Sequence, residues 1–287
     1  MTTDRVGRLA PTPSGDLHLG NTVAFAACWL SARQGGGRVL LRVEDVDRSR
    51  ARRHIEDEQK RDLEWLGLTW DTEVPPQRDR DYPRWLGSLP DTYVCACTRR
   101  TIQEGGGNHP LGCRTRGSVN GAVRYALPDR WVRFNDRVHG PREVRPLEFG
   151  DPVLRRRDGV FTYNLAVVAD DIADGVTEVV RGSDLLDYTA VQIELWKAFG
   201  ATPPTWLHAP LVRGPDGRKL SKSHGALGIS ALRDAGVSVR AIHALVLGWL
   251  GIEGDDLASA VPSFDPSKVT REPIDLPEDW RQPLGLR

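Results

Sequence analysis

Two segments of the sequence combine residue types that could bind and activate a phosphate group. The first, PTPSGDLHLGN (11–21), places Gly15, His18 and Gly20 between a predicted strand and a predicted helix. Small residues at such a junction let the backbone approach a nucleotide, and the positive end of the helix attracts phosphate. The second, RKLSKS (218–223), offers two ammonium groups and two hydroxyls on a predicted loop. Such groups can stabilise the charge that develops on a triphosphate in a transition state.

Each of these segments has a simpler interpretation when it is taken alone. The first could be only a tight turn, and the second only a solvated basic loop. Their presence together in one chain favours a nucleotide site to which both segments contribute.

A third group of residues could bind a metal. Cys95, Cys97, His109 and Cys113 form the pattern C-x-C-x11-H-x3-C. Three thiolates and one imidazole are a typical tetrahedral ligand set for Zn²⁺, and the glycines at 105–107 would let the loop fold back to close the site. We expect one structural zinc per chain, holding an insertion with too few apolar residues for its own core. The alternative is that the cysteines are free thiols and His109 a surface residue.

Composition and charge limit the possible partners and location of the chain. The 287 residues carry 39 basic and 39 acidic side chains, so the formal net charge is zero. Any RNA contact must therefore rely on local patches. The N-terminus lacks the basic start and apolar core of a signal peptide, and no stretch approaches the roughly 18 continuous apolar residues of a membrane span. We expect a monomeric cytoplasmic protein that does not associate with membranes.

An alternation of strand and helix patterns must position these groups, and it predicts an α/β fold with a parallel, Rossmann-type sheet. Strands are expected at 6–9, 39–45 and 176–182, and helices at 22–34, 51–65 and 188–199. The glycines at 35–37 should end the first helix.

Changes in amino-acid composition along the sequence divide the chain into four parts. Short, polar, cysteine-bearing segments rich in Gly, Pro and Arg occupy residues 89–157, which we interpret as an inserted zinc-bearing α+β module. This module splits a catalytic domain into residues 1–88 and 158–228, the second of which carries the KLSKS loop. Residues 229–287 form a short helical C-terminal region.

HLGN (18–21) and KLSKS (219–223) resemble the HIGH and KMSKS motifs of the class I aminoacyl-tRNA synthetases, with Asn21 in place of the last histidine. In the glutamyl branch of that family this position is commonly small or polar. The resemblance implies ATP with Mg²⁺ as a substrate. It also implies that His18 and Lys222 stabilise the α-phosphate as an amino-acid carboxylate attacks it, with Lys219 as a third catalytic residue. The implied ATP-binding residues are Ser14, His18, Gly20, Asn21, Lys219, Leu220, Ser221, Lys222 and Ser223.

Four segments in the same order, GRLAPTPSG, LRVEDVD, YNLAVVADD and VVRGSDLL, resemble the glutamyl-tRNA synthetase family over roughly residues 5–250. The resemblance implies a site for L-glutamate in which Glu44 binds the α-ammonium group. Such a substrate needs a guanidinium fork for its side-chain carboxylate, which Arg8 or Arg181 can provide, and one protein carboxylate. The implied glutamate-binding residues are Arg8, Leu9, Ala10, Pro11, Thr12, Glu44, Tyr163 and Arg181.

The cysteine pair followed by TRRTIQ resembles the zinc-bearing glutamyl-Q tRNA(Asp) synthetase family, in which a tyrosine typically occupies the position of His109. The chain ends at Arg287, where glutamyl-tRNA synthetases continue, so residues 229–287 are expected to resemble a stem-contact region without an anticodon-binding domain. The resemblance implies a two-step reaction. Glutamate and ATP give glutamyl-adenylate and pyrophosphate, and a hydroxyl of queuosine in the tRNA(Asp) anticodon then attacks the adenylate and releases AMP.

Other functions stay open on the residues alone. A truncated glutamyl-tRNA synthetase would charge the 3′ end of tRNA(Glu) instead. A nucleotidyltransferase of related fold would make a small-molecule adenylate or dinucleotide, against which the set Glu44, Tyr163 and Arg181 argues. A zinc-bearing RNA-binding protein with a degenerate core would not need His18 or the two lysines of the loop.

Single residues also have structural interpretations. Glu44 could lie at a solvated strand end, Tyr163 in a core, and Arg181 in a surface ion pair. The arginines of the insertion are candidate contacts to RNA phosphates, or else a solvated surface. They are Arg99, Arg100, Arg114 and Arg116.

Overall fold

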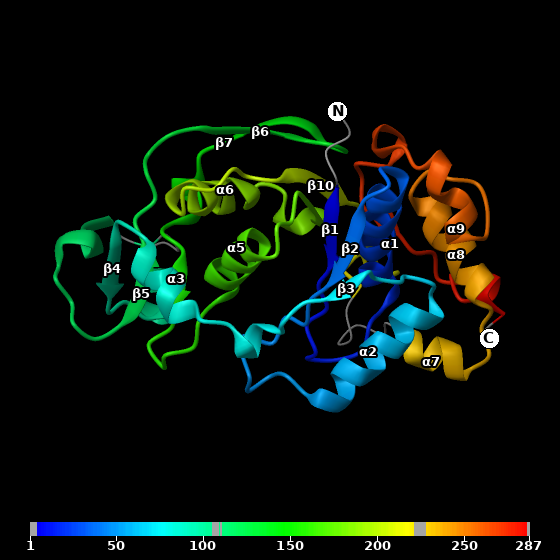
Figure 1. Ribbon diagram of the computed structural model, residues 1–287, viewed down its shortest axis with the longest axis horizontal. Helices are drawn as coiled ribbons and strands as arrows, with labels where there is room; N and C mark the ends of the chain where they lie inside the picture. The colour runs from blue at the N-terminus through cyan, green and yellow to red at the C-terminus, as the bar shows by residue number, and fades with distance from the viewer. Residues whose placement is uncertain (1–4, 105–108, 110, 221–227, 286–287) are drawn as a thin grey trace.

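In the computed structural model, which describes residues 5–104, 109, 111–220 and 228–285, parallel strands occupy the centre of the molecule (Figure 1). β1 (Val6–Leu9) pairs with β2 (Arg38–Leu41), and β2 pairs with β3 (Thr72–Glu73). On the other side of β1 lies β9 (Glu178–Gly182), joined to it where the Thr177 backbone N–H donates to the Val6 carbonyl at 3.0 Å. The sheet then continues through β10 (Thr205–Ala209), β6 (Val132–Asp136) and β7 (Gly140–Val144). The predicted α/β fold with a Rossmann-type sheet is therefore confirmed.

The central strands read as short apolar runs because both of their faces are covered. All four residues of β1 and the last three of β2 are buried, as expected for a parallel sheet between helix layers. The predicted strand 39–45 is longer than the observed one, which ends at Leu41. Glu44 donates its backbone N–H to the Pro11 carbonyl at 2.9 Å, but Pro11 has no N–H to return, so the regular ladder stops.

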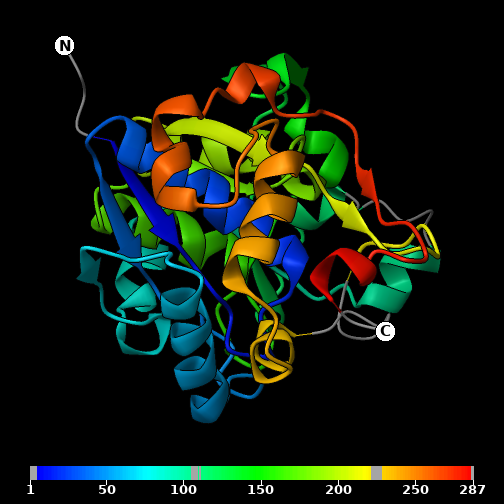
Figure 2. The same ribbon diagram turned by 90° about the vertical axis from the view of Figure 1, so that its right-hand side faces the viewer.

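Helix α1 (Leu19–Gln34) connects β1 to β2 and is apolar on nearly all sides. It packs on the sheet with one face, and α8 (Val239–Trp249) and α9 (Leu257–Ala260) cover the opposite face (Figure 2). The helix ends at the predicted glycines, and Gly36 adopts a φ of 66°, a conformation that costs a residue with a side chain more than it costs glycine. α7 (Ile229–Asp234) packs beside α2 (Arg53–Trp65).

The predicted insertion contributes to two sheets. β4 (Thr92–Cys95), β5 (Ala122–Tyr125) and β8 (Val153–Arg155) form a separate antiparallel sheet at one end of the molecule, which α4 (Arg99–Glu104) accompanies. In contrast, β6 and β7, from the same stretch of chain, join the central sheet beside β10.

The remaining helices and strands complete the packing around these sheets. α3 (Tyr82–Ser88), α5 (Tyr163–Ala173) and α6 (Thr189–Ala198) share one apolar core with residues of the antiparallel sheet. β11 (Val212–Arg213), which precedes the KLSKS segment in the chain, pairs with β12 (Ile274–Asp275). Within the described residues, no helix has the length and apolar character needed to cross a membrane.

Candidate active site

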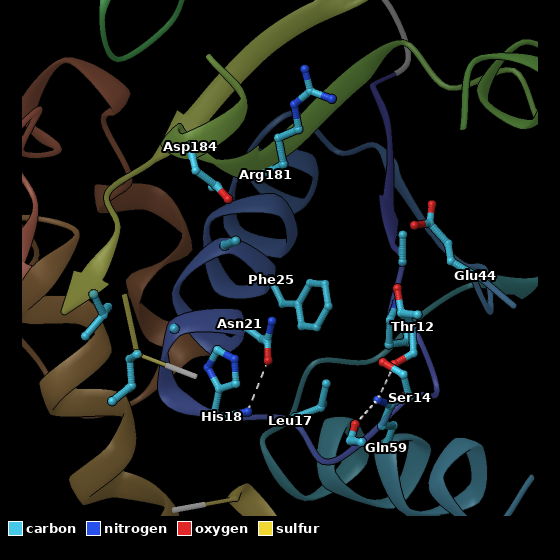
Figure 3. Close-up of a pocket in the computed structure, with 18 of the residues that line it drawn as sticks. Thr12, Ser14, Leu17, His18, Asn21, Phe25, Glu44, Gln59, Arg181 and Asp184 are labelled. Carbon is cyan, nitrogen blue, oxygen red and sulfur yellow. Dashed lines mark hydrogen bonds between the residues drawn. The ribbon is translucent and has the colours of Figure 1, made fainter. Parts of the chain in front are cut away.

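A cavity of about 640 Å³ opens where β1 and β9 end (Figure 3), at the point where the strand order turns from one side of the sheet to the other. Parallel α/β sheets bind ligands at such switch points, and the volume suits a small-molecule substrate. The structure brings the following predicted residues together in its wall: Arg8, Ala10, Pro11, Thr12, Ser14, His18, Gly20, Asn21, Glu44, Tyr163, Arg181, Lys219 and Leu220.

Among the predicted ATP- and glutamate-binding residues that the structure describes, Leu9 is the one that does not line this cavity. Leu9 is fully buried in the main apolar core, because side chains alternate along a strand and its neighbour Arg8 faces the cavity. The predicted contact of Leu9 with glutamate stays a prediction, since a buried side chain does not decide what the Leu9 backbone contacts. Ser221, Lys222 and Ser223 lie outside the described residues.

The HLGN segment forms the start of α1, at one side of the cavity. The His18 backbone N–H donates to Asn21 Oδ1 at 3.2 Å (Figure 3). An amide side chain can provide this helix cap, which accounts for an asparagine at this position. A Cβ on Gly20 would lie 3.1 Å from two atoms of the His18 ring, so glycine lets the imidazole lie against the helix start. The first turn of α1 and His18 thus face a position suited to a phosphate.

Both flanks of the KLSKS segment are attached near HLGN. Leu220 is buried and donates its N–H to the Val212 carbonyl at 2.8 Å. After the segment, Ile229 donates to the Leu17 carbonyl at 2.8 Å. Lys219 Nζ lies 2.5 Å from Asp184 Oδ2, and these side chains are 55% and 38% exposed. Exposed ion pairs contribute only about 0–1 kcal/mol, so a polyphosphate can compete for this lysine.

Arg181, on β9, is a buried cation whose described hydrogen-bond partners are all uncharged. Its shorter bonds go to Gln192 Oε1 at 2.6 Å and Thr189 Oγ1 at 2.7 Å. The longer ones go to the Tyr163 hydroxyl at 3.3 Å and a backbone carbonyl at 3.4 Å. Burial lowers the pKa of Arg181 from its ordinary value, yet a guanidinium stays protonated. Because no described carboxylate forms an ion pair with it, this charge favours an anionic ligand.

A buried histidine and aspartate position Arg181 through its Nε–H group. Asp136 Oδ2 lies 2.7 Å from His208 Nδ1, and both side chains are fully buried. The aspartate fixes the proton on Nδ1, so Nε2 accepts the Arg181 Nε–H at 3.0 Å. Burial is the main cause that lowers the pKa of His208 to about 4, which keeps this acceptor neutral. Sequence reasoning missed Asp136 and His208. The one signal is a histidine inside the largely apolar strand β10, while β6 carries several polar residues and does not single out Asp136.

Glu44 supplies a carboxylate opposite Arg181. One of its oxygens accepts a hydrogen bond from the fully buried Arg42 at 3.2 Å, while Oε2 has no hydrogen-bond partner among the described residues. Burial raises the pKa of Glu44, and the neighbouring Arg42 and Arg8 oppose that rise. Arg8 itself is tied to Asp171 at 2.9 Å through Nε. The cavity therefore offers two cations and one partly free carboxylate at one end, and a helix start with His18 and Lys219 at the other.

The predicted metal ligands meet outside this cavity. The ligand atoms of Cys95, Cys97, His109 and Cys113 all lie within 4.8 Å of one another, and a tetrahedral site with metal bonds of 2.0 to 2.3 Å needs separations of about 3.3 to 3.8 Å. His109 Nε2 points to Cys95 Sγ, 2.9 Å away. These four residues could hold a tetrahedral divalent metal.

The other side of the His109 ring faces a polar outer layer. Nδ1 lies 3.4 Å from the Tyr93 hydroxyl, which donates to Asp151 at 2.6 Å. A chain of this kind orients a metal-binding imidazole so that Nε2 points to the metal.

Comparisons with known proteins agree on one family. A family model described as tRNA synthetases class I (E and Q), catalytic domain, matches residues 5–113 and 114–259. The glutamyl-Q tRNA(Asp) synthetase of Nitratidesulfovibrio vulgaris is 43% identical, with 91% of this chain and 88% of that protein covered. The protein of the same name from Symbiobacterium thermophilum is 38% identical, with 95% and 96% covered.

Solved structures show the same arrangement of the chain. A glutamate tRNA ligase from Elizabethkingia meningosepticum, crystallised in complex with its amino acid, superposes with a TM-score of 0.83 at 25% identity. The alignment covers 97% of this chain and 68% of that one. The glutamate-tRNA synthetase of Elizabethkingia anophelis gives a TM-score of 0.84 at 25% identity over 99% of this chain and 71% of that one.

The His208 pair makes a prediction about stability and pH. The unfolded histidine has a pKa near 6.5 and the folded one about 4, so the unfolded chain binds more protons between these values. The stability contributed by neutral His208 is therefore present above about pH 6.5 and lost as the pH falls towards 4. Urea unfolding should show the stability difference between wild type and His208→Gln shrinking by about 3 kcal/mol over this range. A constant difference would contradict the buried neutral histidine, and His243→Gln, at another buried histidine, is the control.

Proposed function

Because the chain belongs to the glutamyl-Q tRNA(Asp) synthetase family, within the class I tRNA synthetases for glutamate and glutamine, we propose that it activates L-glutamate with ATP and transfers it to queuosine in the anticodon of tRNA(Asp). The observation that carries the proposal is the charge arrangement of the cavity. A buried guanidinium without a carboxylate partner among the described residues lines the same cavity as the Glu44 carboxylate.

Glutamate fits this arrangement through its three charges. Arg181 would bind one carboxylate, since its longer bonds to Tyr163 and Leu185 can be exchanged for a ligand oxygen. Arg8 lines the same wall, and its Nη2 group donates to no other described residue. Glu44 Oε2 would accept from the α-ammonium group. A substrate with two carboxylates and one ammonium matches two cations and one carboxylate.

ATP would lie with its α-phosphate at the start of α1. His18, Lys219 and Lys222 would stabilise the charge that builds on the α-phosphate as the glutamate carboxylate oxygen attacks it and pyrophosphate leaves. Ser14, Gly20, Asn21, Leu220, Ser221 and Ser223 would complete the ATP site, with Mg²⁺ bound to the phosphates. A hydroxyl of the queuosine ring then attacks the activated carbonyl, and AMP leaves. Since AMP is a good leaving group, positioning of the acceptor dominates this step.

Zinc is the metal that we propose for the cysteine cluster, as one structural ion per chain. The set of three thiols and one imidazole suits Zn²⁺, and four protein ligands leave no open position for catalysis. A metal here would join β4 to the turn at Cys113 and so stabilise the antiparallel sheet. Clustered thiols that form no disulfide suit the reducing cytoplasm.

The central test is ATP–pyrophosphate exchange without tRNA, in which we expect exchange with glutamate and none with aspartate or glutamine. Exchange only after addition of tRNA(Glu) would favour a truncated glutamyl-tRNA synthetase, and no exchange under either condition would refute glutamate activation.

In the same assay, Arg181→Lys keeps the charge but loses the planar guanidinium fork, so the KM for glutamate should rise roughly tenfold or more. Arg133→Lys, at an exposed arginine paired with Glu143, is the matched control.

Metal analysis tests the zinc proposal directly. We expect about one zinc per chain in protein purified without chelators, and loss of that zinc with a lower melting temperature in Cys113→Ser. Cys28→Ala, at a cysteine buried within α1, should keep the metal. Protein that is folded by circular dichroism but contains no stoichiometric zinc would contradict the assignment.

A further inference from the structure

Apart from the buried Arg181, the arginines around the cavity fall into two groups. Those beneath it are tied to carboxylates, and they are Arg8, Arg42, Arg78 and Arg80. A second group is exposed and forms no ion pair within the described part of the chain. It includes Arg50, Arg52, Arg53 and Arg155, and we refer to these four as the unpaired arginine group. Arg48 and Arg157 are also exposed without an ion pair among the described residues, but they donate to the backbone carbonyls of Arg78 and Ala96. In a chain with equal numbers of acidic and basic residues, this local excess of positive charge requires its own explanation.

Three members of the group stand at one edge of the cavity. Arg50 lines the cavity itself. The Arg52 backbone N–H donates to the Pro13 carbonyl at 3.0 Å, in the loop that carries Thr12 and Ser14. Arg52 and Arg53 also line a hollow of about 310 Å³ that Pro13 shares. In Figure 1 the start of α2 lies below β1 and β2, on the side where these strands end.

The fourth member, Arg155, ends β8 on the antiparallel sheet. The next residue, Arg156, connects this turn to the edge just described, since its Nη1 lies 2.8 Å from Asp47 Oδ2. Asp47 is three positions before Arg50, so the turn after Arg155 is joined to the loop that carries Arg50.

A second hollow adjoins this part of the surface. It has a volume of about 770 Å³ and is lined by Arg124, Arg157 and Thr162. Thr162 precedes Tyr163, a residue of the cavity wall, so the hollow and the cavity are lined by residues that are neighbours in the chain. Arg124 is 9% exposed and forms no ion pair with a described carboxylate.

We propose that the unpaired arginine group is the RNA contact surface, with phosphates of the anticodon arm bound by Arg50, Arg52 and Arg53 on one side and by Arg155 on the other. This inference rests on the proposed function, which requires a nucleoside to enter the cavity while its strand continues on both sides. Arginines without carboxylate partners bind phosphate at no cost of a broken ion pair, and phosphate contacts fix the position of RNA without reading its sequence.

Two of the arginines named from the sequence are less suited to this role, because they already have carboxylate partners. Arg114 donates to both oxygens of the buried Asp151, and Arg100 is paired with Glu104 at 2.7 Å. The side chain of Arg99 lies outside the described residues, and Arg116 is exposed.

The test compares two triple variants of equal charge. Arg52, Arg53 and Arg155 are replaced by Gln together, with Arg50 left in place because it lines the cavity. The control replaces Arg100, Arg133 and Arg240 by Gln, three exposed arginines that each have a carboxylate partner. Binding of a fluorescent, queuosine-bearing tRNA(Asp) anticodon stem-loop is measured by anisotropy at several salt concentrations, with an acceptor-stem minihelix as the competing RNA.

We expect the test variant to bind the anticodon stem-loop at least roughly tenfold more weakly, and its salt dependence to flatten by about two to three units in the log–log slope. The control should bind like wild type, and both should keep glutamate-dependent exchange without RNA. The inference would be overturned if the two variants bound the stem-loop with equal affinity and equal salt slope. It would also be overturned if the wild-type enzyme bound the minihelix but not the stem-loop. If wild type binds the stem-loop but transfers no glutamate to it, the proposed function fails while the contact surface is still tested.

Discussion

The buried charge of Arg181 is the constraint on which the site depends. Removing a guanidinium from water is costly unless its N–H groups are all satisfied. The fold meets this requirement with neutral acceptors from three different elements, namely Gln192 and Thr189 on α6, His208 on β10 and Tyr163 on α5. No described carboxylate neutralises the charge. The sheet order that brings β9 beside both β1 and β10 is what makes this arrangement possible.

The two ends of the cavity differ in how their charges are held. At the end that carries Arg181, Arg42 is fully buried and contacts Asp171 at 2.7 Å and Asp174 at 3.0 Å, in a network that fixes Arg8 and Glu44. At the end that carries His18, Lys219 and Asp184 form an exposed pair next to a segment attached on both flanks. A buried network breaks at high cost and an exposed pair at low cost. The first arrangement suits recognition of one substrate, and the second suits exchange of partners during a reaction.

The sequence predicted the residues that line the cavity more easily than the residues that hold those side chains in place. HLGN and KLSKS combine several chemical groups within a few positions, so their meaning can be read locally, and Arg8, Glu44 and Arg181 follow once a charged substrate is assumed. Asp136, Thr189, Gln192 and His208 left no such signal, because their role depends on contacts between elements far apart in sequence. The pairing of β6 with β10 likewise depends on tertiary contacts, and the composition of the segment that contains β6 indicates only an insertion. The end of β2 at Leu41 could have been predicted from Pro11, had the neighbouring strand been known.

The position of the transferred glutamate tests the account most directly. Queuosine-bearing tRNA(Asp) is incubated with the enzyme, ATP and radiolabelled glutamate, then cut by nuclease so that the anticodon fragment separates from the 3′ end. The account predicts that the label stays on the anticodon fragment and that the same tRNA with unmodified guanosine at that position accepts none. Label on the 3′-terminal fragment, or equal labelling of modified and unmodified tRNA, would contradict it.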